Sequence, residues 1–376
     1  MKKEELIKHL RSLREKDAFY DSGTALSSMC SKPDGLGVEA FELYRDANLL
    51  DGDLFPNARI LEAEAIKKLG LILSNTNPSG CLTSGSTEGN LTALWVARRM
   101  KPGAIKVMIP ESAHYSLPKI AEIMGLDVVY APLDENYKAK VEFIRENLNE
   151  SFLACVLTAG TTELGVIDPV EEVEALCREK NVFLHVDAAY GGFIIPFLRY
   201  AGYAMPGFDF ALEGVCSVTA DPHKMGLAPI PAGAVLFRDN ALSSTIRKPE
   251  YLSNSAEGFL GTKTGGSAAA VWALLEYYGI EGYSRIAAKC MENARSLFSE
   301  LEGMDGVTPV MKPVLPVVCF KTRGKKESIR NALYSMGWRI NYNKASNNFR
   351  IVVMPHVTEE AIGGFLKDLR EILRNA

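Results

Sequence analysis

The chain has 376 residues, of which 47% are apolar, and this size predicts a large buried core divided into two or three domains. The net charge of −4, without blocks of like charge, gives no indication of nucleic-acid binding. No apolar stretch approaches the length of a membrane span, and the mixed charges of residues 2–5 are not typical of a secretory leader. Seven cysteines without a C-x-x-C pair argue against a disulfide framework or a metal site, so a reducing cytoplasm is the expected compartment.

The start of the chain is predicted to form a short helix and an ordered wrapping segment. Residues 4–16 have the spacing of an amphipathic helix. Residues 20–58 lack a clear period and are rich in glycine, serine, aspartate and proline, but they also carry Met29, Phe41 and Phe55. Because such large apolar side chains favour burial, we expect an ordered segment rather than a linker.

From about residue 58 onward, short apolar segments alternate with helical patterns. This alternation predicts an α/β fold, in which helices cover both faces of a mostly parallel sheet. The expected helices include Leu91–Arg99 and Val170–Lys180. The expected strands are Ile105–Ile109, Val128–Ala131, Leu153–Thr158, Val182–Val186, Ser217–Thr219 and Ala234–Phe237.

A smaller α+β unit is predicted toward the C-terminal end. A long helix begins at about residue 284, and the last helix is expected over Glu359–Leu373. The strands between them are Val317–Lys321, Arg339–Tyr342 and Phe349–Met354. The predicted parts are an N-terminal helix and wrapping segment (1–57), a large α/β domain (58–283) and a small α+β domain (284–376).

Polar segments follow three strands of the predicted parallel sheet. Asp187 ends one strand, Thr161 follows another, and Lys224 follows a third. In open α/β sheets, ligands bind outside the carboxyl ends of the strands. A lysine that forms a Schiff base and a carboxylate that keeps a proton on a pyridine nitrogen are the two groups that pyridoxal phosphate chemistry requires. We therefore expect this cofactor and an amino-acid substrate.

The lysine lies in the short loop Asp221–Gly226. Partial burial beside a cationic group would favour the free amine of Lys224, which attack on an aldehyde requires. His223 has two interpretations: it contacts the phosphate or the substrate, or it is a packed residue that orients the loop. Ala189, two residues after Asp187, is small enough to lie beneath a flat ring.

Residues Thr83–Asn90 are rich in glycine and small hydroxyl residues and run into the predicted helix Leu91–Arg99. Backbone N–H groups at the start of a helix attract an anion, so Ser86 and Thr87 are candidates for phosphate binding. The alternative is that one of these hydroxyl groups only caps the helix. The segment is not a Walker P-loop, because the Gly-Lys-Ser/Thr ending is missing.

Three further loop residues are singled out by their positions. His114 follows the strand Ile105–Ile109 and is expected to stack on the ring, the alternative being a hydrogen-bonded structural histidine. Thr161 would place a hydroxyl group near the ring oxygen of the cofactor. Asp168 is interpreted as structural, because an acidic N-cap followed by proline and, three residues after the aspartate, by glutamate is typical of a helix start.

These motifs resemble the group II pyridoxal-phosphate-dependent amino-acid decarboxylases of fold type I, the aspartate aminotransferase-like fold, over nearly the whole chain. The segments that carry the resemblance are Thr83–Asn90, His114, Thr161–Thr162, His185–Gly192 and Asp221–Lys224. Most relatives have asparagine before Pro-His-Lys, whereas an archaeal branch of tyrosine/aspartate decarboxylases shares Asp221. Further segments similar to that branch are Met29–Cys30, Asn48–Leu49, Leu54–Pro56 and Arg350–His356.

The resemblance assigns a role to most of the candidate cofactor-binding residues. The implied contacts are Lys224 as the Schiff-base lysine, Asp187 at the pyridinium nitrogen, His114 and Ala189 on the two faces of the ring, and Ser86, Thr87 and His223 at the phosphate.

The resemblance also implies a homodimer whose active site is shared between the subunits. Gly261 and Thr262 begin a segment similar to the one that reaches the partner's phosphate. Tyr251, in the polar loop before it, resembles the tyrosine that protonates the substrate carbon after CO₂ leaves, and His114 is the alternative proton donor. A loop that closes over the site would keep water out.

The expected reaction is decarboxylation of L-aspartate to β-alanine, of L-tyrosine to tyramine, or of both, feeding coenzyme A or methanofuran biosynthesis. Arg350 lies where the family binds the substrate carboxylate, which a guanidinium group holds in two-pronged fashion. Its alternative is a surface charge on an edge strand. Asn48 is a second candidate substrate contact. An acidic substrate side chain needs a further cation, for which Lys263 and Arg350 are candidates.

Other activities remain open at this point. L-Glutamate is an alternative substrate. A cysteine desulfurase or a related lyase would need a mobile, reactive cysteine near residues 248–262, where the sequence has none. A sphingosine-phosphate lyase-like role would favour a membrane anchor. A protein that binds the cofactor without catalysis is disfavoured by the intact set of Lys224, Asp187 and His114.

Overall fold

The structure is a computed structural model that describes residues 1–244 and 258–374. It divides into two compact units: one comprises Pro33–Ala288, and the other comprises Met1–Lys32 together with Lys289–Ala376. These units follow the chain differently from the three predicted parts, because the first 32 residues belong with the C-terminal region. The three-part division remains a prediction.

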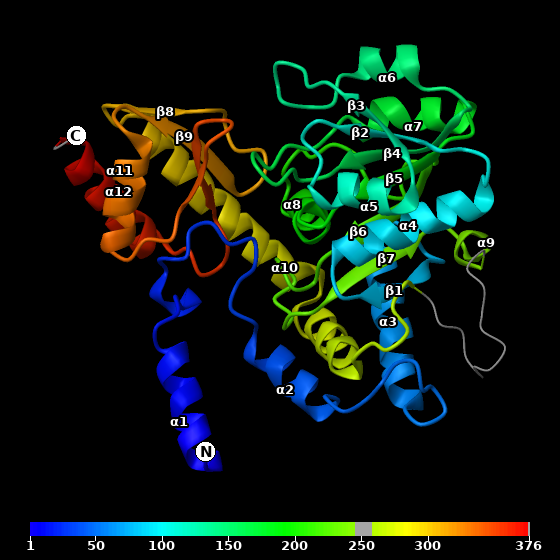
Figure 1. Ribbon diagram of the computed structural model, residues 1–376, viewed down its shortest axis with the longest axis horizontal. Coiled ribbons are helices and arrows are strands. Elements are labelled where there is room, and N and C mark those ends of the chain that lie inside the picture. Colours follow the sequence, from blue (N-terminus) through cyan, green and yellow to red (C-terminus); the bar gives the residue numbers. More distant parts are fainter. Residues whose placement is uncertain (245–257, 375–376) are drawn as a thin grey trace. The chain divides into compact units, whose positions relative to one another are not determined.

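The larger unit is built on a seven-stranded sheet with the order β1-β7-β6-β5-β4-β2-β3 (Figure 1). The five neighbouring strands from β6 to β3 are parallel, whereas β7 is antiparallel to both β6 and β1, which confirms the α/β fold with a mostly parallel sheet. All six predicted strands are present with shifted ends. The edge strand β1 is absent from the prediction because it contains glycine and lacks the apolar run of a central strand. The strands are β1 (Ser79–Thr83), β2 (Lys106–Pro110), β3 (Asp127–Ala131), β4 (Phe152–Thr158), β5 (Phe183–Asp187), β6 (Val215–Ala220) and β7 (Gly233–Phe237).

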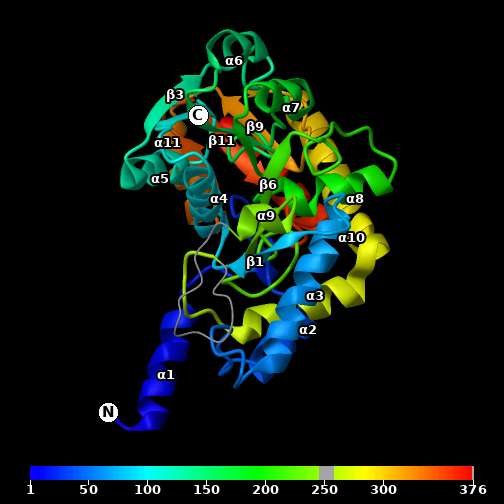
Figure 2. The same ribbon diagram turned by 90° about the vertical axis from the view of Figure 1, so that its right-hand side faces the viewer.

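Helices connect and flank the strands of this sheet (Figures 1 and 2). They are α2 (Gly35–Leu43), α3 (Pro56–Ile72), α4 (Ser86–Met100), α5 (Ser116–Met124), α6 (Val141–Asn147), α7 (Val170–Glu179), the 3₁₀ turn η2 (Gly191–Phe193), α8 (Ile195–Tyr200), α9 (Asn240–Ser243) and the first part of α10 (Gly265–Glu302). Apolar side chains of α4 and α5 form one buried cluster with side chains of β2, β4 and β7. The long helix α10 starts well before the predicted residue 284 and is interrupted at Gly279, where φ is 52°. Of the helices in the described parts of the chain, none is long and apolar enough to cross a membrane.

Helix α4 lies close against the sheet because a glycine faces β6. A Cβ atom on Gly89 would lie 2.6 Å from Cγ2 of Thr219, so no side chain fits between the helix and the strand. The helix begins at Ser86, before the predicted start at Leu91. As a result, Ser86 lies in the first turn, and Asn90 one turn later faces the polar ends of β5 and β6.

The smaller unit contains a four-stranded antiparallel sheet with the order β10-β11-β9-β8. The short strand β8 and the helix α11 are absent from the prediction, although the buried residues Ile329 and Leu333 of α11 have helical spacing. The elements of this unit are α1 (Lys3–Arg14), the 3₁₀ turn η1 (Tyr20–Ser22), β8 (Val307–Pro309), β9 (Val317–Thr322), α11 (Lys326–Ser335), β10 (Asn341–Asn343), β11 (Asn348–Val352) and α12 (Glu359–Arg374).

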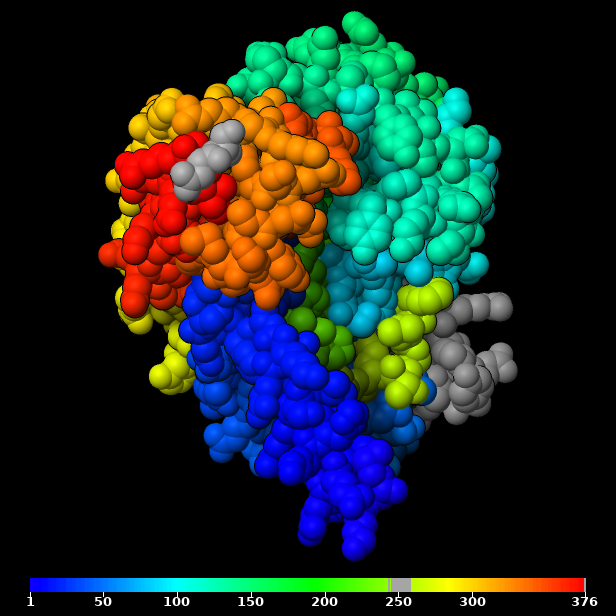
Figure 3. Space-filling model, turned by 60° about the vertical axis from the view of Figure 1, so that its left-hand side comes forward, coloured from blue at the N-terminus to red at the C-terminus, as the bar shows by residue number. Residues whose placement is uncertain are grey.

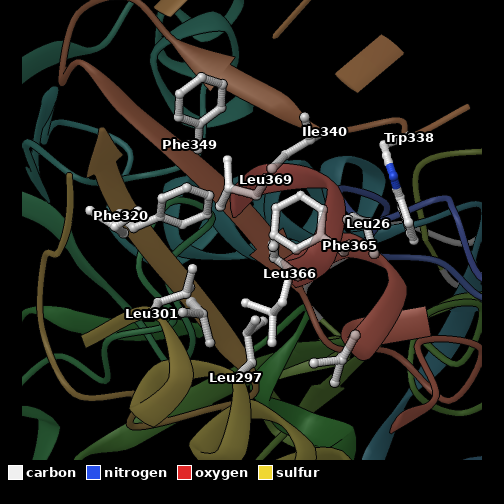
Figure 4. Close-up of a cluster of buried hydrophobic side chains, with 14 of the residues drawn as sticks. Leu26, Leu297, Leu301, Phe320, Trp338, Ile340, Phe349, Phe365, Leu366 and Leu369 are labelled. Atoms are coloured by element: carbon white, nitrogen blue, oxygen red, sulfur yellow. The ribbon is translucent and has the colours of Figure 1, made fainter. Parts of the chain in front are cut away.

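The core of the smaller unit is formed by apolar side chains of the sheet and of α12. The buried residues of α12 recur at helical spacing and include Phe365, Leu366 and Leu369, which Figure 4 shows among Phe320 and Phe349 of the sheet. The N-terminal segment joins this unit through backbone bonds at Leu26, whose N–H group donates to the carbonyl of residue 339 and whose carbonyl accepts from the N–H of residue 352.

Candidate cofactor and active site

The candidate lysine projects from a tight turn at the carboxyl end of β6. The N–H group of Lys224 donates to the carbonyl of Asp221 at 3.0 Å and closes the turn. The Nζ atom of Lys224 lies 3.1 Å from Oδ2 of Asp221, and the lysine side chain is 18% exposed. The amine is therefore partly buried and held beside a carboxylate of its own turn.

Asp221 also joins this turn to the start of α4. The residue is 3% exposed, and its Oδ1 accepts a hydrogen bond of 2.8 Å from Oγ of Ser86. Ser86 is itself buried, whereas Thr87, the next residue of the first turn, is exposed. The ion-pair partner of the Lys224 amine is thus an anion, in addition to the cationic group expected near it.

His223 orients the lysine turn and faces the start of α4. Its Nδ1 accepts the N–H of Ala232 at 3.2 Å, and its Nε2 lies 3.6 Å from Oδ2 of Asp221. Burial lowers the pKa of His223, so the ring is neutral and carries its proton on Nε2. A Cβ atom on Gly85 would lie 3.3 Å from Cε1 of His223, so the imidazole ring also lies next to Gly85, the residue before α4.

Asp187 lies in a buried polar network at the carboxyl end of β5. Alternate residues of a strand point to the same face, and His185 and Asp187 of β5 pair in register with Ser217 and Thr219 of β6. Asn90 of α4 donates from Nδ2 to Oδ2 of Asp187 at 2.8 Å. The backbone N–H of residue 189 donates to Oδ1 of Asp187 at 3.1 Å. The Thr219 hydroxyl lies 3.5 Å from Oδ1 as a further donor, so two side chains and one backbone N–H fix the carboxylate.

His185 fixes the orientation of the Asn90 amide. Its Nε2 lies 2.9 Å from Oδ1 of Asn90, and its Nδ1 lies 2.8 Å from Oγ of Ser217. Burial lowers the pKa of His185 to about 4, so the ring is neutral and donates one proton. The hydroxyl of Thr219 donates to the same Oδ1 at 3.0 Å. The amide nitrogen of Asn90 must therefore face Asp187.

Asn90 is a site residue that the sequence prediction missed. Two signals point to it: Asn90 lies four residues after Ser86, on the same face of α4, and the polar residues of β5 and β6 alternate. We expect Asn90→Ala to lower the free energy of unfolding by roughly 3 kcal/mol, because buried groups of Asp187 and His185 lose their partner. Urea denaturation measures this loss of stability. The control is Asn57→Ala, because Asn57 is exposed and lies in α3. A loss of stability no larger than that of the control would contradict the network.

His114 shares the site with the charged residues. Its Nδ1 lies 2.8 Å from Oγ of Ser116 and accepts the backbone N–H of the same residue at 3.3 Å. Burial lowers the pKa of His114, while the charge of Asp187 raises it and that of Lys224 lowers it. The neutral ring therefore carries its proton on Nε2 and lies within electrostatic reach of both residues. Its stacking on a cofactor remains a prediction.

Thr161 and Ala189 lie in the loops after β4 and β5. The hydroxyl of Thr161 is buried and accepts the N–H of Val166 at 3.0 Å, so it closes its own loop. The carbonyl of Ala189 accepts the N–H of Asp221 at 3.3 Å. This bond joins the loop after β5 to the turn 221–226 that carries Lys224. Their predicted contacts to the ring remain predictions.

The segment that contains Gly261 and Thr262 lies beside the start of α4 in the same chain. Both residues are exposed, and Thr262 lines a cavity of about 120 Å³ together with Ser84. The backbone N–H of residue 260 donates to Oε1 of Glu88 at 3.2 Å. The predicted contact of this segment with a partner's phosphate remains a prediction, and Tyr251 lies outside the described residues.

Lys263 and Asn48 have partners within their own unit. The side chain of Lys263 is 10% exposed, and its Nζ lies 3.0 Å from Oε1 of Glu62 and 3.0 Å from a backbone carbonyl of β1. Its charge is neutralised there, which disfavours its predicted use for an acidic substrate. Asn48 accepts the N–H of Leu50 at 3.1 Å and donates to Asp51 at 2.9 Å, so it shapes the loop that pairs with residues 263–265.

Arg350 belongs to the smaller unit, on the interior strand β11. The residue is 9% exposed, and its guanidinium donates to the carbonyl of Ser27 at 3.1 Å. The alternative of a surface charge on an edge strand is therefore wrong. Its contact with a substrate carboxylate remains a prediction.

Asp168 holds two loops together and does not cap α7. Pro169 occupies the N-cap position of that helix, which corrects the predicted acidic cap. The carboxylate is 1% exposed and accepts the N–H of Ala139 at 2.9 Å and that of Thr158 at 2.8 Å. Burial raises the pKa of Asp168 to about 6 in spite of these two bonds. The residue is structural, as predicted, through a different set of contacts.

The stability of the protein is expected to depend on pH through Asp168. Its pKa of about 6 in the folded state lies above the model-compound value of 3.8, so the folded state binds this proton more tightly than the unfolded state. The resulting stabilisation is complete below about pH 4 and is lost as the pH rises through about 6, a change of roughly 3 kcal/mol. Asp168→Asn removes the titration.

We therefore expect the free energy of unfolding of the wild type, minus that of Asp168→Asn, to fall between about pH 4 and pH 7. Urea titrations of both proteins across this range measure the difference. A difference that is constant or rises with pH would contradict the raised pKa of Asp168.

The residues brought together at the carboxyl ends of β5 and β6 fit pyridoxal phosphate. Lys224 supplies an amine for the aldehyde, and Asp187 supplies a buried, oriented carboxylate for the ring nitrogen. The first N–H groups of α4 have no partners within the helix, so they can bind an anion. Gly85, just before the helix, leaves space for this anion that a Cβ atom would reduce. Fold and donor set together define a fold type I pyridoxal-phosphate enzyme.

Comparison with known proteins agrees with this class. The family described as "Pyridoxal-dependent decarboxylase conserved domain" matches residues 46–323. The chain is 42% identical over 359 residues to a probable L-tyrosine/L-aspartate decarboxylase of Methanothermobacter thermautotrophicus, covering 94% of this chain and 98% of that protein. It is 39% identical over 379 residues to the L-aspartate/L-glutamate decarboxylase of Pyrococcus horikoshii, covering 99% and 97%. The solved sphingosine-1-phosphate lyase of Burkholderia pseudomallei K96243 superposes with a TM-score of 0.91 at 28% identity, covering 100% of this chain and 91% of that chain.

The chain belongs to the pyridoxal-dependent decarboxylase family. It is a carboxy-lyase that acts on an amino acid with pyridoxal 5′-phosphate as cofactor, which confirms the resemblance, the reaction class and the cofactor predicted from the motifs.

Proposed function

We propose that the protein removes the α-carboxyl group of L-aspartate to give β-alanine, and that L-tyrosine, giving tyramine, is its second substrate. Aspartate is supported because it is the substrate that the names of the Methanothermobacter and Pyrococcus relatives share. β-Alanine would feed coenzyme A biosynthesis, and tyramine would feed methanofuran biosynthesis. The single observation that carries the decarboxylase assignment is the meeting of Lys224, Asp187 and the start of α4 at one sheet edge.

Within this proposal, Lys224 attaches the cofactor covalently and Asp187 keeps a proton on its ring nitrogen. The bound cofactor supplies an electron sink for the bond that breaks at the substrate α-carbon. Asn90 and the backbone N–H of residue 189 fix the carboxylate of Asp187, which would accept a hydrogen bond from the protonated ring nitrogen. Ser86 and Thr87 bind the phosphate together with the first N–H groups of α4.

His223 completes the phosphate site, and Gly261 and Thr262 of a partner subunit approach it from the other side. His114 and Ala189 would contact the two faces of the ring, and Thr161 would lie near its oxygen. These contacts rest on the family pattern, and they are supported by the backbone bond that joins the Ala189 loop to the lysine turn.

Substrate binding is assigned to Arg350 and Asn48. A buried guanidinium is suited to a carboxylate, because its planar donors match the two oxygens. Tyr251 returns a proton to the α-carbon after CO₂ leaves, with Nε2 of His114 as the alternative donor. The neutral state of His114, with the proton on Nε2, supports that alternative.

We also propose a homodimer with a shared active site. This is supported by α1, none of whose residues is buried and whose side chains lie at the surface in Figure 3. Leu6, Leu10 and Leu13 are 44%, 51% and 47% exposed and form an apolar stripe along this helix. Light scattering of the wild type should give the mass of two chains, and Leu10→Glu should shift the mass toward one chain.

Parallel assays of the purified, cofactor-loaded protein test the substrate. L-Aspartate and L-tyrosine are supplied separately, and CO₂ and the amine are measured together. We expect β-alanine to form faster than tyramine, with one CO₂ released per amine. Tyramine alone would replace aspartate as the main substrate, and GABA formed only from L-glutamate would overturn the proposal in favour of the alternative. Alanine and sulfide from cysteine would point to desulfurase chemistry.

A further inference from the structure

Asp221 is the first residue of the lysine turn and contacts three residues of the site. Its Oδ1 is bonded to Ser86 of α4 at 2.8 Å, and its Oδ2 lies 3.1 Å from Nζ of Lys224 and 3.6 Å from Nε2 of His223. The aspartate is 3% exposed, so water screens its charge poorly. Beyond this turn, His114 lies within electrostatic reach of Lys224, and the charges of Asp187 and Lys119 act on the same histidine.

The charge of this buried carboxylate must be balanced by a neighbour. Ser86 is neutral, and His223 is neutral because burial lowers its pKa and because its Nδ1 accepts a backbone N–H. Among the described residues in contact with Asp221, Lys224 is therefore the one that carries a full positive charge. A buried carboxylate that loses its only charged partner is strongly destabilised.

The need for a positive neighbour of Asp221 affects the protonation of the Lys224 nitrogen once the cofactor is attached to it. When Lys224 is joined to the cofactor aldehyde, its nitrogen stays positive only if it keeps one proton. Oδ2 of Asp221 faces that nitrogen and favours the protonated form electrostatically. We propose that Asp221 is a positioning residue that keeps the attached nitrogen of Lys224 protonated and turned toward the phosphate end of the site.

The proposal rests on attachment of the cofactor at Lys224, and its test uses the cofactor spectrum. The visible absorbance of the loaded protein changes when the lysine–cofactor linkage loses its proton, and a pH titration gives the midpoint. We expect the midpoint of Asp221→Asn to lie about one to three pH units below that of the wild type, since one opposite charge is removed. Asparagine is the residue that most relatives of the family pattern carry here, so this variant should fold.

Asp168→Asn is the matched control, because it also removes a buried carboxyl group of the larger unit without touching Lys224. Its midpoint should equal that of the wild type. A midpoint of Asp221→Asn that does not move, or that moves equally in the control, would overturn the proposal. A wild type without any lysine-linked absorbance would instead overturn the attachment at Lys224.

A second measurement covers an Asp221→Asn variant that fails to bind the cofactor. The rate at which acetic anhydride modifies Lys224 in the cofactor-free protein reports its free amine, and mass spectrometry resolves this lysine from the others. Modification of Lys224 in Asp221→Asn should begin at a lower pH than in the wild type. Equal pH dependence in both proteins would overturn the proposal.

Discussion

Replacing Lys224 with alanine is expected to abolish decarboxylation while leaving the protein folded. The lysine side chain is 18% exposed and projects from a turn outside the sheet, so we expect the fold to tolerate its removal. Its loss removes the covalent attachment of the cofactor and the amine that releases the product. The loss of kcat should therefore exceed the roughly 10²–10⁴-fold that removal of one acid–base group costs.

Turnover of L-aspartate and the visible absorbance of the cofactor measure this effect. Lys119→Ala is the matched control, because Lys119 is exposed and its charge also acts on His114. The control should retain both turnover and absorbance. Normal turnover by Lys224→Ala would show that another lysine attaches the cofactor.

The second large effect is expected for Asp187→Asn. The asparagine has the size of aspartate but no negative charge, so it cannot keep a proton on the ring nitrogen. The two carboxylate oxygens of Asp187 each accept one hydrogen bond, from Asn90 and from the N–H of residue 189. An asparagine side chain has one oxygen and one NH₂ group, so it can replace only one of these two acceptors. We expect kcat to fall by about 10³-fold or more, by analogy with the loss of a preorganised electrostatic contact.

Asp209→Asn separates this effect from a loss of stability. Asp209 is also fully buried and pairs with Arg199 at 2.8 Å, away from the lysine turn. Its variant should lose stability and retain most of its turnover. If Asp187→Asn keeps kcat within about tenfold of the wild type, the proton-holding role of Asp187 is wrong.

The fold was predictable where short segments carry strong local patterns. β4, which is buried along its whole length, and the amphipathic helix α12 are examples. Elements with weak patterns were not predictable: β1 is a glycine-containing edge strand, and α2 lies in a segment without periodicity. The long helix α10 starts earlier than predicted because its first part is apolar and small rather than periodic.

The site was predictable as a set of residue types at strand ends, and unpredictable in its contacts. Asp187 and Lys224 follow β5 and β6, whose adjacency follows from a parallel sheet. The bonds from Asn90 to Asp187 and from Ser86 to Asp221 depend on how closely α4 lies on the sheet, which Gly89 allows. The distance between α4 and the sheet cannot be predicted from a local sequence pattern. These hydrogen-bond partners are therefore visible only in the packed structure.

Reduction of the cofactor-loaded protein with borohydride, followed by peptide mass mapping, tests the central assignment most directly. Borohydride fixes the cofactor to the nitrogen that holds it. We expect one labelled peptide per chain, with the added pyridoxyl mass on Lys224. A label on Lys263, Lys119 or any other lysine, or no label on a protein that decarboxylates amino acids, would contradict this assignment.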